Sequence, residues 1–206
     1  NLLQAAVVVA TLFQNAATVS AATLPDGYKE IEYIESTGTQ YIDAGFRLTS
    51  DMSVSVTFAP TEKASAASGV FGARNAVNTK NFSAFYDANY VLCDFNSSLY
   101  SNYRAQTSSY AAGTKYTVND SAAKREVLDA NSQVSLGSNS SLCPDAFTCD
   151  YNATVFLVNN AGWAKGKIRL YSLTVVTNGS DTVRSFVPCR RESDQAIGLY
   201  DISGQS

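Results

Sequence analysis

The stretch Ser53-Val54-Ser55-Val56-Thr57-Phe58 alternates strictly between polar and apolar side chains. A β-strand turns successive side chains to opposite faces, so this pattern predicts a strand with one buried and one solvated face. Strands of this kind are typical of antiparallel sheets, because only one face of such a sheet has to be covered. The stretch therefore indicates an antiparallel β-fold.

Runs of similar character follow one another from Lys29 onward, with polar turns between them. We expect strands at residues 30–34, 40–44, 52–58, 70–73, 82–86, 115–118, 154–158, 168–176 and 182–187. Many short strands with no helix between them predict an all-β sandwich or jelly roll. The stretch Ser97 to Ser141 is polar and weakly patterned, and we expect it to carry long loops.

The first 25 residues contain no charged side chain. On a helical projection their polar and apolar residues separate onto two sides, which favours a helix. The run Val7-Val8-Val9 has high strand propensity and leaves open an extended arm that adds to a neighbour's sheet. A retained signal sequence is a third reading, because Val19-Ser20-Ala21-Ala22 would suit cleavage.

We expect residues 1–23 to form a hydrophobic assembly segment and residues 24–206 to form one domain. The segment is expected to drive self-association into a homopolymer, with a membrane at most as an intermediate before assembly. The side chains expected to be buried in that assembly are Leu2, Leu3, Val9, Leu12 and Phe13. The net charge is −3 and no run of Lys or Arg occurs, so we expect no nucleic-acid partner.

Two longer stretches, residues 24–46 (LPDGYKEIEYIESTGTQYIDAGF) and residues 166–204, resemble the opening and closing strands of a concanavalin A-like, laminin-G-like jelly-roll family. The run Val70-Phe71-Gly72-Ala73-Arg74 resembles an internal strand of the same family. The family is common in secreted and surface proteins of bacteria and their phages. The resemblance implies an antiparallel jelly-roll sandwich over residues 24–206 and an extracellular or cell-surface location, and it transfers no defined catalytic set.

Histidine is absent, which removes nucleophilic machinery that depends on an imidazole base. Glu30, Glu32 and Glu35 superficially resemble the E-x-D-x-x-E motif of laminarinase-type glycoside hydrolases, where two carboxylates act across the scissile bond. This chain has Glu where that motif has Asp, and Trp163 is its only tryptophan. We therefore expect these three charges to lie on a solvated strand face, no catalytic residues, and a protein that is not an enzyme.

Four cysteines favour an oxidising compartment. The spacing of Cys143 and Cys149 fits a local disulfide-closed loop, which leaves Cys93 for Cys189, although four cysteines allow three connectivities. The spacing of a zinc site is missing, so we expect no metal and no cofactor. Asp43, Asp87 and Asp94 could supply oxygens to calcium, but no acidic loop has recognisable spacing.

Aromatic residues in polar, loop-like surroundings are the candidates for stacking on sugar rings: Tyr100, Tyr103, Tyr110 and Trp163. Asn102, Arg104 and Asn160 are their hydrogen-bonding neighbours. The alternative is that these tyrosines cover the outer face of a sandwich. We expect the chain to be the subunit of a pilus-like extracellular filament. The alternative function is a secreted carbohydrate-binding or adhesion module, and the third is a glycoside hydrolase.

Overall fold

The computed structural model describes residues 24–75, 79–96, 103–177 and 181–204. These ranges form strands and turns and contain no helix, so the expected all-β class is confirmed for this part of the chain. None of it offers a helix long and apolar enough to cross a membrane. The expected assembly segment, with Leu2, Leu3, Val9, Leu12 and Phe13, lies outside the described residues.

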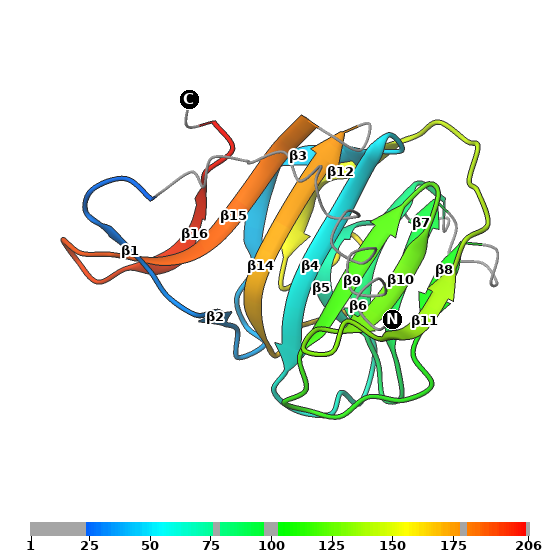
Figure 1. The fold of residues 1–206 in the computed structure, drawn as a ribbon, viewed down its shortest axis with the longest axis horizontal. Helices are drawn as coiled ribbons and strands as arrows, with labels where there is room; N and C mark the ends of the chain where they lie inside the picture. The colour runs from blue at the N-terminus through cyan, green and yellow to red at the C-terminus, as the bar shows by residue number, and fades with distance from the viewer. Residues whose placement is uncertain (1–23, 76–78, 97–102, 178–180, 205–206) are drawn as a thin grey trace, which may run out of the picture.

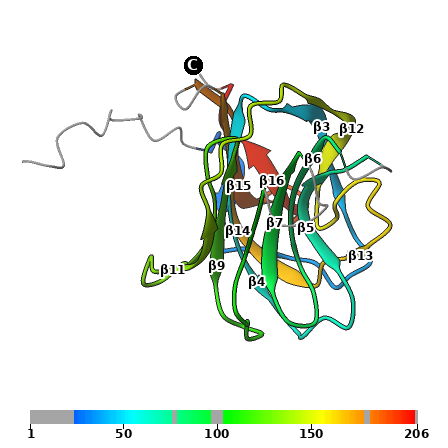
Figure 2. The same ribbon diagram turned by 90° about the vertical axis from the view of Figure 1, so that its right-hand side faces the viewer.

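Two sheets face each other across one core (Figures 1 and 2). The first sheet has the order β1-β15-β14-β4-β9-β10-β11, with β16 beside β15 and β2 beside β14. Its strands are β1 (Tyr28–Glu30), β2 (Ile34–Glu35), β4 (Met52–Pro60), β9 (Tyr116–Ser121), β10 (Arg125–Asp129), β11 (Ser135–Asn139), β14 (Ile168–Thr177), β15 (Asp181–Arg191) and β16 (Ile197–Asp201).

The second sheet has the order β3-β12-β5-β6-β7-β8, with β13 beside β5. Its strands are β3 (Ile42–Thr49), β5 (Ser68–Ala73), β6 (Asn81–Tyr86), β7 (Val91–Asn96), β8 (Arg104–Gln106), β12 (Thr148–Val155) and β13 (Ala164–Lys165). Pairing is antiparallel throughout both sheets except between β13 and β5.

The alternating stretch of the sequence becomes β4, near the centre of the first sheet. Val54, Val56 and Phe58 are at most 4% exposed and point into the core, as the alternation predicts. On the outer face, the hydroxyls of Thr57 and Thr117 lie 2.9 Å apart and bond across β4 and β9. Burying each of these apolar side chains away from water stabilises the folded state by about 1.5–3 kcal/mol.

The expectation that residues 97–141 carry long loops is wrong. Four strands, β8 to β11, lie in that stretch, and β9 to β11 extend the first sheet to its edge (Figure 1). Two inward positions of these strands hold charged residues, Asp120 and Arg125, both at most 3% exposed. The predicted strand at 115–118 corresponds to the start of β9. Asp120 and Arg125 interrupt the apolar alternation beyond it, so the rest of β9 and β10 do not stand out in the sequence.

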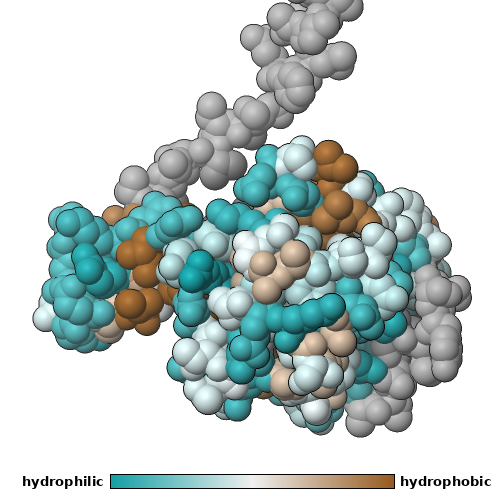
Figure 3. Space-filling model, turned by 90° about the horizontal axis from the view of Figure 1, so that it is seen from below, coloured by the Kyte–Doolittle hydropathy of each residue, from teal (hydrophilic) through white to brown (hydrophobic). Residues whose placement is uncertain are grey.

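A lateral flap made of β1, β16 and the second half of β15 projects from the body of the sandwich (Figure 1). On the face seen in Figure 3 most side chains are hydrophilic or intermediate, and hydrophobic ones gather beside this flap and at the upper edge of the body as drawn. The rings of Tyr28 and Tyr200 pack against each other in the flap at a tilt of 60°, with their centres 4.9 Å apart. Ile197 in β16 is 65% exposed.

Candidate functional site

A hollow of about 520 Å³ opens where β3, β12 and β13 meet. This volume lies in the range of small-molecule sites in proteins. Its walls come from the turn before β3, from the start of β3, from β12, from the loop that follows β12, and from β13. The lining residues are Gly38, Tyr41, Asp43, Thr154, Leu157, Asn159, Trp163, Ala164 and Lys165.

Two aromatic rings border this hollow. Tyr41, directly before β3, is 55% exposed, and the ammonium of Lys165 lies 5.7 Å from its ring centre. Trp163 is half-buried, and it contacts two residues that do not line the hollow. Its ring centre lies 4.3 Å from that of Phe85, and the Arg74 guanidinium lies 4.8 Å from it. The Trp163 ring therefore has a fixed place in the wall.

The polar groups of the hollow are also held in place. The carboxylate of Asp43 accepts from the Gly45 amide at 2.8 Å and from the Asn152 side-chain amide at 3.2 Å. Gly45 has φ +76°, a left-handed conformation that suits glycine and lets the chain turn back toward this carboxylate. The Asn159 side-chain amide donates to the Asn152 carbonyl at 2.9 Å. These bonds orient one acceptor and one amide at the hollow.

The sequence-predicted sugar-binding residues divide between several places. Trp163 lines the hollow, whereas Tyr100 and Asn102 lie outside the described residues. Tyr110 uses its hydroxyl to accept from the Ala64 amide at 2.8 Å. Tyr103 packs on the core, with the Arg125 guanidinium 5.5 Å from its ring centre. Both described tyrosines therefore serve packing in this structure.

The polar residues expected beside these aromatic residues also lie in different parts of the fold. Arg104 forms a bidentate ion pair with Asp94, at 2.6 and 2.9 Å. Asn160 is exposed in the loop between β12 and Trp163, and it has φ +59°. Of the three aspartates considered for calcium, Asp43 lines the hollow, Asp87 caps a turn by accepting from two backbone amides, and Asp94 is held by Arg104. The described fold does not bring these three carboxylates together.

Sequence reasoning missed Tyr41, Asn159 and Lys165 as members of one site. Tyr41 follows the polar turn Ser36–Gln40, which is a signal for an exposed aromatic, but the strand predicted at residues 40–44 includes it. Asn159 stands four residues before Trp163, within reach of the same loop. Lys165 gave no signal, because its place depends on the parallel pairing of β13 with β5.

Glu30 and Glu35 lie in strands of the first sheet and Glu32 in the bend between them, and none of the three lines the hollow. Glu30 is in β1 opposite Cys189, and Glu32 lies 3.9 Å from the Lys115 ammonium. Glu35 pairs with Arg169 at 2.7 Å. Arg169 also covers Tyr33, and Lys115 covers Tyr171, so these charges fasten the first strands onto β14 and β9.

All four cysteines are buried free thiols in the structure. It does not support the expected Cys143–Cys149 and Cys93–Cys189 disulfides. The Cys149 thiol donates to the Lys80 carbonyl at 3.2 Å, and the Cys143 sulfur accepts from the Asn96 amide at 3.6 Å. Cys93 and Cys189 lie on different sheets, in β7 and β15. These contacts and positions suit packing.

We expect all four thiols to react with iodoacetamide in denaturant without reductant and to resist it in the native protein. The thiolate is the reactive form, and burial raises the pKa of Cys149 to about 12 and raises those of Cys93 and Cys189. Intact-mass spectrometry counts the adducts. Four adducts after denaturation agree with the structure, whereas two would restore one disulfide of the sequence prediction.

No protein-family model matches the chain, and no curated protein matches it. Among solved structures, mouse laminin α1 chain domains LG4-5 align over 85% of this chain and 42% of theirs, with 14% identity and a TM-score of 0.46. A Trypanosoma rangeli sialidase in complex with 2,3-difluoro-KDN aligns over 62% of this chain and 20% of its own, with 16% identity and a TM-score of 0.44. This chain thus spans less than half the length of either protein.

One expectation from the sequence is contradicted here. We expected a protein that is not an enzyme, yet several of the similar structures are sialidases, and one is a mutant that displays trans-sialidase activity. The similarity amounts to 12–16% identity over about a fifth of those chains. The expectation that the protein is not an enzyme is withdrawn, and this similarity assigns no activity to the chain.

Proposed function

We propose that this chain is a carbohydrate-binding or adhesion module that takes a sugar into the hollow between Tyr41 and Trp163. One observation carries the proposal. Two aromatic rings from different segments border a single hollow together with a carboxylate, a side-chain amide and an ammonium group.

This combination matches the chemistry of a sugar ring. A pyranose presents a face of C–H groups that packs on an aromatic ring, and an edge of hydroxyls that both donate and accept hydrogen bonds. Asp43 accepts from hydroxyls, and Lys165 donates to them. Because the bonds to Gly45 and Asn152 already orient Asp43, little freedom has to be lost when a sugar binds.

The laminin-G-like jelly-roll assignment and the extracellular location belong to this proposal. The two-sheet antiparallel sandwich is compatible with the first, and the resemblance of residues 24–46 and 166–204 supports both. The described residues give the filament subunit no support, so the module replaces it as our main reading. Self-association through residues 1–22 stays a prediction from the sequence.

Replacing Trp163 or Tyr41 with alanine is expected to weaken glycan binding about fivefold to tenfold, because each ring supplies about 1–1.4 kcal/mol of stacking. Binding is first surveyed on an array of immobilised glycans, and the soluble form of the strongest hit is then titrated calorimetrically. Tyr151→Ala is the matched control, because Tyr151 is 43% exposed and does not line the hollow.

Equal affinities in all three variants would place the binding site elsewhere. An array without signal from the intact protein would remove the proposed function itself.

A further inference from the structure

The loop that carries Leu157, Asn159 and Trp163 leaves β12 through a residue in an unusual conformation. Phe156 has φ +67°, and its side chain is only 3% exposed. A bulky aromatic residue in the left-handed region is a genuine outlier. Such a conformation persists only where the surrounding contacts leave the chain no alternative.

Backbone hydrogen bonds fix this loop at both of its ends. The Phe156 amide donates to the Val70 carbonyl at 2.8 Å, and the Phe156 carbonyl accepts from the Gly166 amide at 2.7 Å. In the middle, the Asn159 amide donates to the Gly72 carbonyl at 3.1 Å, and the Asn159 carbonyl accepts from the Arg74 amide at 3.0 Å. The loop is therefore tied to β5 and to the residue that follows it.

The loop also lies directly on a glycine of β5. A Cβ atom at Gly69 would stand 2.3 Å from the Val158 nitrogen and 2.6 Å from the Leu157 carbonyl carbon. Those neighbours are backbone atoms, so they could yield only if the loop itself moved. The loop can therefore occupy its observed position only because Gly69 has no side chain.

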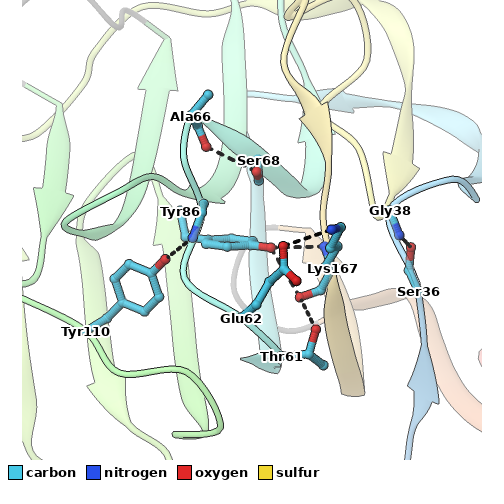
Figure 4. A network of polar contacts seen from close by, with 10 residues as sticks. Ser36, Gly38, Thr61, Glu62, Ala66, Ser68, Tyr86, Tyr110 and Lys167 are labelled. Carbon is cyan, nitrogen blue, oxygen red and sulfur yellow. Dashed lines mark hydrogen bonds and ion pairs between the residues drawn. The ribbon is translucent and has the colours of Figure 1, made fainter.

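Beyond the loop, Lys167 is anchored from the other side of the core (Figure 4). The Tyr86 hydroxyl accepts from the Lys167 amide at 2.9 Å and donates to the Lys167 carbonyl at 3.2 Å. Burial raises the pKa of Tyr86 to about 12, so this hydroxyl keeps its proton. The side chain of Lys167 pairs with Glu62 at 2.8 Å and covers Gly38, which lines the hollow.

We propose that Phe156 and Gly69 are positioning residues that hold Trp163 in its binding place before any ligand arrives. Neither residue lines the hollow, so each acts through the loop and not by contact. The part of this inference that concerns ligand affinity rests on the proposed function, whereas the part that concerns the Trp163 ring does not. Recognition then needs no closing movement of the loop.

Trp163 is the only tryptophan, so its fluorescence reports the place of the loop directly. In Phe156→Gly and Gly69→Ala we expect the Trp163 emission to shift to longer wavelength and its quenching by acrylamide to increase. If the binding-competent position falls to about a tenth of the population, the dissociation constant of the strongest array glycan rises about tenfold. Gly198→Ala is the matched control, since a Cβ there meets nothing within 4 Å.

Phe156→Leu is a milder third variant, with an expected emission shift between those of the wild type and Phe156→Gly. It decides the question if circular dichroism shows that the other two variants do not fold. Unchanged emission and quenching in the folded variants would overturn the proposal. A wild-type protein that binds no glycan would remove the proposed function, while the emission would still decide whether Phe156 and Gly69 position Trp163.

Discussion

Replacing Arg104 with alanine is expected to lower the free energy of unfolding by about 3–5 kcal/mol, because it leaves a buried carboxylate without its partner. Asp94 is fully buried, and the Arg104 guanidinium bonds both of its oxygens, at 2.6 and 2.9 Å. Arg104 also lies 5.8 Å from the ring centre of Phe85, which backs Trp163. Urea unfolding followed by circular dichroism measures the loss.

Arg191→Ala is the matched control for this variant. Arg191 bonds both oxygens of Asp194 in the same bidentate manner, at 2.6 and 2.9 Å, but the two side chains are each 48% exposed. An exposed pair of this kind contributes about 0–1 kcal/mol. The double variant Asp94→Leu/Arg104→Met should regain most of the stability lost in Arg104→Ala, because it removes both charges together. Similar losses in Arg104→Ala and Arg191→Ala would show that burial of Asp94 is not the decisive factor.

The part of the fold that the sequence predicts is the part where apolar residues alternate. β4 and β14 are found almost at their predicted bounds, since Val54 and Leu170 follow the two-residue period of a strand facing a core. β7 was missed although it is almost wholly buried. Its outward positions are covered as well, by the pair Phe85–Trp163 and by Arg104, so that strand shows no alternation to detect.

Only part of the candidate site was predictable, because its residues lie far apart in the sequence. Trp163 stands out as a lone tryptophan in a polar stretch, whereas Tyr41 lies more than a hundred residues earlier in the chain. The two meet because β12 pairs with both β3 and β5, and because Gly69 lets the loop lie flat on β5. Neither condition is visible in one sequence. The sequence marks Asp43 only as a possible metal ligand, because it does not show that Asn152 lies beside Asp43 in the fold.

A second large change in stability is expected on replacing another buried acidic residue, Asp120 in β9. This carboxyl is 3% exposed, and neither of its oxygens has a hydrogen-bond partner. Burial raises its pKa well above the usual range, and Asp94 adds to the rise. Arg125 opposes the shift, but its two terminal nitrogens donate to the carbonyls of Ser121, Ala122 and Ser141 and to the Asn139 side chain, and its Nε makes no hydrogen bond to Asp120. We therefore expect the effect of burial to prevail.

A raised carboxyl pKa makes the folded protein bind more protons than the unfolded chain, whose aspartates titrate near pH 3.9. The contribution of Asp120 to stability is then fully present below about pH 3.9 and is lost as the pH rises toward the folded pKa. The loss amounts to about 1.4 kcal/mol for each pH unit within that window. The variant Asp120→Asn cannot ionise, so it should be the more stable protein at neutral pH, and its advantage should shrink as the pH falls.

Urea titrations of both proteins between pH 4 and pH 8 measure this difference, and the other titrating groups cancel because they are common to the pair. Asp150→Asn is the control of opposite sign. The bond from Lys80 lowers the pKa of Asp150, so this variant should be the less stable protein at neutral pH and should approach the wild type in acid. Parallel stability profiles for wild type and Asp120→Asn would mean that Arg125 keeps Asp120 ionised throughout. Asp120 and Arg125 would then form a buried ion pair. The carbonyl oxygens around Arg125 would not be enough to stabilise the charge of its guanidinium.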